Sequence, residues 1–315
     1  MKIVLLESLA VTDAVVDKYA ETLQKAGHTL YSYTKNIDEA LLIKRVKDAG
    51  VIIIANMPLS AKVIESCERL KFIDVAFTGV DHVALEAAKA KGVAVSNASG
   101  YATEAVAELV IGLAISLLRN VPQVDKRCRE GGVKDGLVGS LIRGKTVGIV
   151  GCGAIGLRTA ELFSAFGCDI IAHEPAPKAD TPDYIRFAPL SELLTLSDIV
   201  TLHCPLLDST RGLINKDTLA VMKPSAILIN AARGPVVDSE ALAEALNSGR
   251  IAGAGIDVFE TEPPLPAGHP LLRSKNTIVT PHIAFASKES MELRAEIVFS
   301  NLFAWLNDKQ SNKIL

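Results

Sequence analysis

The sequence predicts an α/β protein of two domains, each built on an open, parallel β-sheet. The chain has 315 residues, which corresponds to roughly two domains of ~150 residues. Short runs of apolar, β-branched residues alternate with helix-length segments along it, as in right-handed βαβ units. These runs are apolar at nearly every position, which is typical of parallel strands that helices cover on both faces.

The first domain is expected to end near residue 100. Its helices are expected at residues 13–26 and 61–69, between strands. Its strands are expected at residues 2–6, 51–55, 72–76 and 93–96.

A long apolar helix over residues 104–119 and a glycine-rich loop over 130–144 are expected to separate the two sheets. The apolar run 109–118 within that helix is too short for a membrane span, which needs ~20 residues. A final helix is expected at 287–307, with nothing strand-like after it. The second sheet is expected to consist of strands at 146–150, 169–172, 199–203, 226–230, 253–257 and 276–280.

Composition excludes several classes of protein. The net charge is −3 and the pI is about 6.1, so the sequence predicts no nucleic-acid partner. A hydrophobic share of 49% excludes a disordered chain, and the first residues predict a strand and not a signal segment. The five cysteines form no CxxC pair, and no metal-ligand spacing occurs. The cysteine pattern therefore favours reduced thiols in the cytoplasm, without a disulfide framework or a metal site.

The sharpest motif is the GxGxxG sequence that follows the strand at 146–150 and opens a helix. Its first glycine permits a tight turn, the second lets a pyrophosphate approach the backbone, and the third allows close packing of helix on strand. The N-terminus of the helix offers free N–H groups and a positive dipole end to phosphates. Because methyltransferases carry similar loops, the motif alone leaves that class open. The predicted cofactor contacts are Gly151, Gly153, Ala154, Ile155 and Gly156.

Glu174 ends the next predicted strand, 18 residues after Gly156. A carboxylate at this distance hydrogen-bonds a ribose diol and repels a 2′-phosphate, so the sequence favours NAD over NADP. Lys178 leaves binding of a 2′-phosphate open.

Three residues that together suit carbonyl reduction follow strands of the second sheet: Arg233, Glu262 and His282. A guanidinium binds a carboxylate through two parallel hydrogen bonds and polarises the neighbouring carbonyl. An imidazolium donates a proton to the carbonyl oxygen, and a carboxylate behind it fixes its orientation. Each residue alone also has a structural explanation, and the sequence does not establish that the three meet.

With these motifs in their order and spacing, the chain resembles the D-isomer-specific 2-hydroxyacid dehydrogenases over essentially all of its length. The resemblance implies that Arg233, Glu262 and His282 form the catalytic triad. It also implies further cofactor contacts: Asp257 with the nicotinamide carboxamide, Val106, Ala231 and Ala232 near the nicotinamide, and His203, Cys204 and Pro205 on the adenine side. The motifs that carry the resemblance are VGIVGCGAIG, LHCPLLDSTRGLIN, LINAARGPVVD, GAGIDVFETEP, HPL and TPHIA.

The resemblance also amends the domain organisation. It implies that a Rossmann-type, doubly wound NAD-binding domain, residues 100–285, is inserted into a smaller flavodoxin-like domain. The smaller domain, residues 1–99 with 286–315 returning to it, binds the substrate, and the active site lies in the cleft between the domains. The resemblance further implies a homodimer paired through the helix at 104–119, although the apolarity of that helix equally suits an intradomain core.

Candidate substrate contacts lie in the first domain. The resemblance implies that the backbone around Thr78 and Gly79 binds the substrate carboxylate. Asn56 stands where phosphate-handling relatives carry an arginine, so a phosphorylated substrate is disfavoured. Tyr101 matches a tyrosine that D-lactate-type members use against the substrate, and it equally suits packing at a hinge.

The expected activity is therefore hydride transfer between NADH and a small 2-keto acid, such as pyruvate, glyoxylate or hydroxypyruvate, to give the D-2-hydroxy acid. The alternative is an NAD(H)-sensing interaction protein of the corepressor type, which can retain the same triad. Short termini and the absence of a basic tail favour the enzyme.

Overall fold

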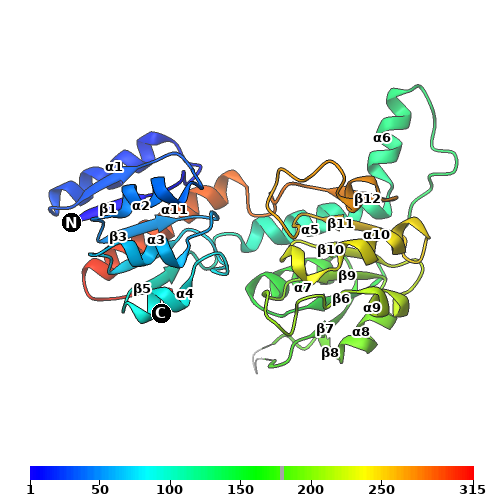
Figure 1. The fold of residues 1–315 in the computed structure, drawn as a ribbon. Helices are drawn as coiled ribbons and strands as arrows, with labels where there is room; N and C mark the ends of the chain where they lie inside the picture. Colours follow the sequence, from blue (N-terminus) through cyan, green and yellow to red (C-terminus); the bar gives the residue numbers. More distant parts are fainter. Residues whose placement is uncertain (178–180) are drawn as a thin grey trace. The chain divides into compact units, whose positions relative to one another are not determined.

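The computed structural model describes residues 1–177 and 181–315, so Lys178 lies outside the described residues. The chain divides into two compact units. The five-stranded unit comprises Met1–Ala102 and Ala286–Leu315, and the seven-stranded unit comprises Thr103–Phe285. Both units are α/β, as the sequence predicts (Figure 1).

The five-stranded unit contains an all-parallel sheet in the order β2-β1-β3-β4-β5. This order is the flavodoxin-like order, in which the direction of winding reverses between β1 and β3. The strands are β1 (Lys2–Leu5), β2 (Thr29–Ser32), β3 (Val51–Ile54), β4 (Phe72–Val75) and β5 (Ala94–Asn97). The helices are α1 (Asp13–Lys25), α2 (Glu39–Val46), α3 (Ala61–Ser66), α4 (Leu85–Ala90) and α11 (Lys288–Leu306).

Burial explains which strands the sequence pattern found. Every residue of β3 and β4 is buried, and both strands were predicted. The edge strand β2 was missed, because three of its four side chains are exposed and it has no continuous apolar run.

Helix α11 returns the end of the chain to the five-stranded unit. Trp305 stacks on Phe72 of β4 with ring centroids 4.9 Å apart, and Phe299 stacks on Tyr19 of α1 at 4.0 Å. The sequence predicted nothing strand-like after α11. In the structure, Lys313 forms an antiparallel bridge with Ser96 of β5. The tail thus protects the outer edge of the sheet.

The seven-stranded unit contains a second all-parallel sheet, in the order β12-β11-β10-β9-β6-β7-β8. Winding reverses between β6 and β9, as in a Rossmann sheet. The strands are β6 (Thr146–Val150), β7 (Asp169–His173), β8 (Ile185–Phe187), β9 (Ile199–Leu202), β10 (Ile227–Asn230), β11 (Gly253–Ile256) and β12 (Thr277–Val279). The helices are α5 (Thr103–Leu118), α6 (Val121–Arg129), α7 (Ala154–Ala165), α8 (Leu190–Leu196), α9 (Lys216–Val221) and α10 (Ser239–Asn247).

Helices cover both faces of this sheet. Helices α5 and α7 pack on each other and on the strands, and Gly255 of β11 leaves room for Leu113 of α5. The neighbours Ala254 and Ile256 belong to a core cluster with residues of α8, α9 and α10. Successive residues of a strand face opposite sides of the sheet. Gly255 therefore faces α5, while Ala254 and Ile256 face the core cluster on the other side.

Helix α5 is mainly a core helix of its unit. Its buried residues include Val110, Leu113 and Ala114. No single helix among the described residues is long and apolar enough to cross a membrane. Helices α5 and α6 reach that length and composition only as a pair, and the pair is bent by 60°.

Candidate active site

The glycine loop lies at the point where the winding of the seven-stranded sheet reverses, between β6 and α7. Gly151 has φ +96°, and a Cβ there would lie 2.6 Å from the backbone nitrogen of Cys204. A Cβ on Gly156 would lie 2.0 Å from the carbonyl oxygen of Gly151. Both positions therefore require glycine for the fold itself.

Gly153 differs from these two glycines, because a Cβ there would meet nothing within 4 Å. The residue is exposed and forms the N-cap of α7, where no side chain caps the helix. Ala154 and Ile155 follow in the first turn, so backbone N–H groups and the positive end of the helix dipole face open space. This cradle fits the pyrophosphate of a dinucleotide, which would fill the space that a side chain would occupy.

Glu174 lies at the end of β7 beside this loop. Its Oε2 accepts a hydrogen bond from the backbone N–H of Cys152 at 2.9 Å, which ties the carboxylate to the loop. Burial, and to a smaller extent the charge of Glu174, raises the pKa of the Cys152 thiol to about 11. The pKa of Cys204 is also raised to about 11, mainly by burial, so both thiols are neutral at neutral pH.

The residues after β9 border the loop from the other side. Burial lowers the pKa of His203 to about 3, so its ring is neutral at neutral pH. Its Nε2 lies 3.0 Å from the hydroxyl oxygen of Thr201. Cys204 is buried and Pro205 is exposed.

The predicted triad lies at the carboxyl ends of three neighbouring strands. Asn230, Ile256 and Val279 occupy equivalent positions on β10, β11 and β12. Arg233 and His282 each follow these positions by three residues, and Glu262 follows by six. All three side chains therefore belong to one edge of the sheet.

The structure brings Glu262 and His282 into direct contact. The imidazole Nδ1 lies 2.8 and 2.9 Å from the two carboxylate oxygens. The side chain of His282 is 12% exposed, whereas that of Glu262 is 54% exposed. The ring of Phe285 meets the imidazole edge-on at 5.4 Å and covers part of it.

Asp257 holds the loop that carries His282. Its fully buried carboxylate accepts hydrogen bonds from the hydroxyl of Thr280 at 2.6 Å, and from the backbone N–H groups of Ile283 and Ala284 at 2.8 and 2.9 Å. His282 has φ +55°, a left-handed conformation that costs free energy in a non-glycine residue. The hydrogen bonds to Asp257 stabilise that conformation.

Arg233 lies in the turn after β10. The side chain of Asn230, the last residue of the strand, accepts from the N–H of Ala232 at 3.1 Å and donates to the carbonyl of Arg233 at 3.0 Å. A Cβ on Gly234 would overlap the backbone of Phe259, so the turn packs directly on the segment that leads to Glu262. Ala231 is half-buried in the same turn, and Val106 is buried in the first turns of α5.

The predicted substrate contacts lie at the carboxyl edge of the five-stranded sheet. Asn56 follows β3, Thr78 and Gly79 follow β4, and Tyr101 follows β5. Thr78 is exposed, and its carbonyl accepts a hydrogen bond from the side chain of Asn97 at 2.7 Å. Tyr101 is only 3% exposed, with the guanidinium of Arg294 5.7 Å from its ring centroid.

Three charged residues at this edge were not predicted from the sequence: Glu7, Lys35 and Arg294. Lys35 donates to Oδ1 of Asn56 at 2.9 Å, and Glu7 is buried beside that loop. A charged residue directly after an apolar strand was the available signal for Glu7. No local pattern marks Lys35 or Arg294.

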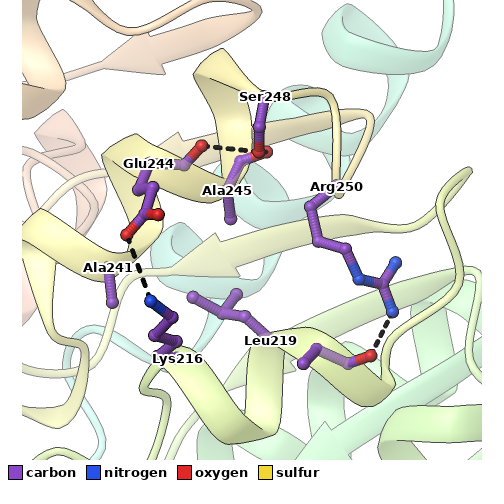
Figure 2. A pocket seen from close by; sticks show the side chains of 8 residues that line it. Lys216, Leu219, Ala241, Glu244, Ala245, Ser248 and Arg250 are labelled. Carbon is purple, nitrogen blue, oxygen red and sulfur yellow. Dashed lines mark hydrogen bonds and ion pairs between the residues drawn. The ribbon is translucent and has the colours of Figure 1, made fainter.

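A surface pocket of about 210 Å³ lies elsewhere, between α9 and α10 (Figure 2). Lys216 and Glu244 face each other across it at 3.9 Å, and Leu219 and Ala245 line its wall. It contains none of the predicted site residues.

Residues 1–177 and 181–315 contain no group of three or more His, Cys, Asp or Glu side chains that could hold a metal ion.

Comparison with known proteins identifies the family. The model of the D-isomer specific 2-hydroxyacid dehydrogenase NAD binding domain matches residues 111–284. The chain belongs to the D-isomer specific 2-hydroxyacid dehydrogenase family. As a member of this family it is an NAD-dependent 2-hydroxyacid dehydrogenase, and the resemblance noted in the sequence is confirmed.

Relatives are similar over nearly the whole chain. A hydroxypyruvate reductase of Blautia hydrogenotrophica is 34% identical over 323 aligned positions, which cover 100% of this chain and 99% of the relative. A glyoxylate reductase of Thermofilum pendens is 39% identical and covers 89% of this chain and 84% of its own. Among solved structures, an acyclic imino acid reductase in complex with NADPH and D-Arg has a TM-score of 0.92, with 29% identity and full coverage of both chains.

Proposed function

We propose that this family member uses NADH to reduce a small 2-keto acid, with glyoxylate and hydroxypyruvate as the leading substrates, and yields the D-2-hydroxy acid. The observation that carries the proposal is the His282–Glu262 pair at the edge of a sheet whose glycine loop fits a dinucleotide. The names of the two relatives support the choice of substrates.

His282 is the proposed proton donor and Glu262 its orienting partner. Bound NADH supplies the hydride to the carbonyl carbon of the substrate. Because Glu262 accepts from Nδ1–H, the protonated ring presents its Nε2–H to the carbonyl oxygen and gives up that proton as the hydroxyl forms. Glu262 stabilises the protonated ring electrostatically.

Arg233 is the proposed binding group for the carboxylate of the substrate. A guanidinium forms two parallel hydrogen bonds to a carboxylate and polarises the adjacent carbonyl, which favours hydride addition there. Asn230 and Gly234 fix the turn that carries Arg233. The backbone of the turn therefore loses little conformational entropy when the substrate binds. In the five-stranded unit, Asn56, Thr78, Gly79 and Tyr101 are the proposed substrate contacts.

NADH is the proposed cofactor rather than NADPH. Glu174 is held at the end of β7 by its hydrogen bond to Cys152 N–H, where a carboxylate pairs with a ribose diol and repels a 2′-phosphate. Asp257, Val106 and Ala231 are proposed to contact the nicotinamide end, and His203, Cys204 and Pro205 the adenine end.

A homodimer is the proposed assembly. Helix α6, which packs on α5, and the loop after it leave apolar side chains exposed, and a second copy of the chain would cover them. These side chains include Val121, Val133, Val138 and Leu141, with 46%, 67%, 79% and 71% of their surface exposed. Light scattering of the purified protein tests the assembly, and a monomeric mass contradicts it.

The test of the function is a matrix of steady-state assays. Consumption of NADH and of NADPH is followed with glyoxylate, hydroxypyruvate, pyruvate and oxaloacetate, and the chirality of the product is determined separately. We expect the highest kcat/KM with NADH and one of the first two acids. Tight NADH binding without turnover on any keto acid would instead support a dinucleotide-sensing interaction protein.

A further inference from the structure

A polar cluster lies where the winding of the five-stranded sheet reverses. Glu7 follows β1, Lys35 follows β2 and Asn56 follows β3, and β1 lies between β2 and β3 in the sheet. In open α/β sheets, ligands bind outside the carboxyl ends of the strands at this reversal point. The three side chains therefore stand at the preferred ligand position of this unit.

Glu7 fixes the loop that carries Asn56. Its carboxylate is buried, and Oε1 accepts hydrogen bonds from the backbone N–H groups of Ala55 at 2.7 Å and Met57 at 3.0 Å. These residues flank Asn56 on either side. The backbone at Asn56 is thus held in place without using the side chain of Asn56.

Lys35 is the exposed cation of the cluster. Lys35 Nζ lies 3.7 Å from Oε2 of Glu7, with half of the lysine side chain exposed. Glu7 also attracts the guanidinium of Arg294, which is buried and donates to the carbonyl of Leu9 at 2.6 Å. One buried carboxylate thus faces two cations, and the exposed cation is Lys35.

The orientation of Asn56 follows from its contact with Lys35. An ammonium group only donates, so Asn56 must present its carbonyl oxygen, Oδ1, to Lys35 at 2.9 Å. Its Nδ2 then carries two further donors, and no acceptor for them is found in the part of the chain that the structure describes. Together the two side chains offer donors and positive charge, a combination that suits an oxygen acceptor.

We propose that Lys35, together with Asn56, determines specificity at C3 of the 2-keto acid and favours a C3 that bears an acceptor oxygen over an unsubstituted methyl. This inference rests on the proposed function. Asn56 carries no charge of its own, and Lys35 places a cation beside it in space. A C3 hydroxyl or carboxylate replaces water as the acceptor for these donors, whereas a methyl leaves them without a partner.

The test compares substrates that differ only at C3. Glyoxylate has no C3, and in pyruvate C3 is an unsubstituted methyl group. C3 bears a hydroxyl in hydroxypyruvate and a carboxylate in oxaloacetate. In the Lys35→Met variant we expect kcat/KM for hydroxypyruvate and oxaloacetate to fall about tenfold or more, with glyoxylate and pyruvate within about twofold of the wild type. Lys35→Arg keeps the cation and should retain most of the preference.

Lys62→Met is the matched control, since Lys62 forms a similar exposed ion pair with Glu39 at 2.7 Å on the neighbouring helices α3 and α2. It should leave all four substrates unchanged, and thermal unfolding of each variant verifies the fold. An equal fall on all four substrates, or none, overturns the role of Lys35 while the proposed reduction stands. A wild-type protein that reduces none of the four overturns both proposals.

Discussion

In the seven-stranded unit, the residues proposed for chemistry follow their strands within a few positions, whereas in the five-stranded unit the polar cluster draws on both ends of the chain. Arg233 and His282 each lie three residues beyond a strand. Glu7 and Arg294, by contrast, lie 287 residues apart in the sequence and still attract each other. Short motifs reveal the first kind of site, and only folding assembles the second.

The largest expected effect concerns His282, at the edge of the seven-stranded sheet that the sequence motifs marked. His282→Ala removes the proposed proton donor, so kcat for keto-acid reduction at neutral pH should fall by about 100-fold or more. Steady-state kinetics with NADH in excess measure this. The control is His28→Ala, in the five-stranded unit, which should leave kcat unchanged. Near-normal turnover of the His282 variant would exclude this residue from proton transfer.

The glycine loop offers a matched pair of substitutions. Gly153→Ala meets open space, so the fold should be unaffected, while the added methyl competes with the pyrophosphate and weakens NADH binding by about tenfold. Gly156→Ala meets the carbonyl of Gly151 and should lower the free energy of unfolding by ~1–3 kcal/mol. Fluorescence titration with NADH and thermal unfolding separate the two effects. Equal losses of stability in the two variants would contradict the assignment of Gly153 to cofactor binding and of Gly156 to the fold.

A further prediction concerns the core of the five-stranded unit. Asp74 on β4 is fully buried, and burial raises its pKa well above the ordinary range, although its hydrogen bond from Asn301 at 3.2 Å opposes this. A raised pKa in the folded state means that stability falls as the pH rises from the ordinary carboxyl range towards the raised value. Asp74→Asn removes this dependence.

Urea unfolding between pH 4 and pH 8 measures the dependence. The stability of the wild type relative to Asp74→Asn should decline with rising pH, by at most ~1.4 kcal/mol per pH unit for one proton. Asp17→Asn, at an exposed position of α1, should show no such trend. A difference that does not change with pH would mean that Asp74 titrates as an ordinary carboxyl.

The prediction of the fold succeeded for the inner strands and for the edge strands β5 and β12, and it missed the edge strands β2 and β8. The inner strands are apolar at nearly every position, so their pattern is visible. The edge strand β2 is largely exposed and β8 has three residues, so neither forms a continuous apolar run. The bridge from Lys313 to Ser96 depends on the path of the chain after α11 and on no local preference.

The sequence by itself determined the fold class, the glycine loop and the places of Arg233, Glu262 and His282 after their strands, because these depend on strand periodicity and on residues close to a strand end. Tertiary structure decided the contact of His282 with Glu262, the hold of Asp257 on that loop and the placement of Lys35 beside Asn56. These contacts depend on which strand ends lie side by side in the sheet. A hydrogen bond needs its two atoms about 3 Å apart in space, and the number of residues between them in the sequence does not give that distance.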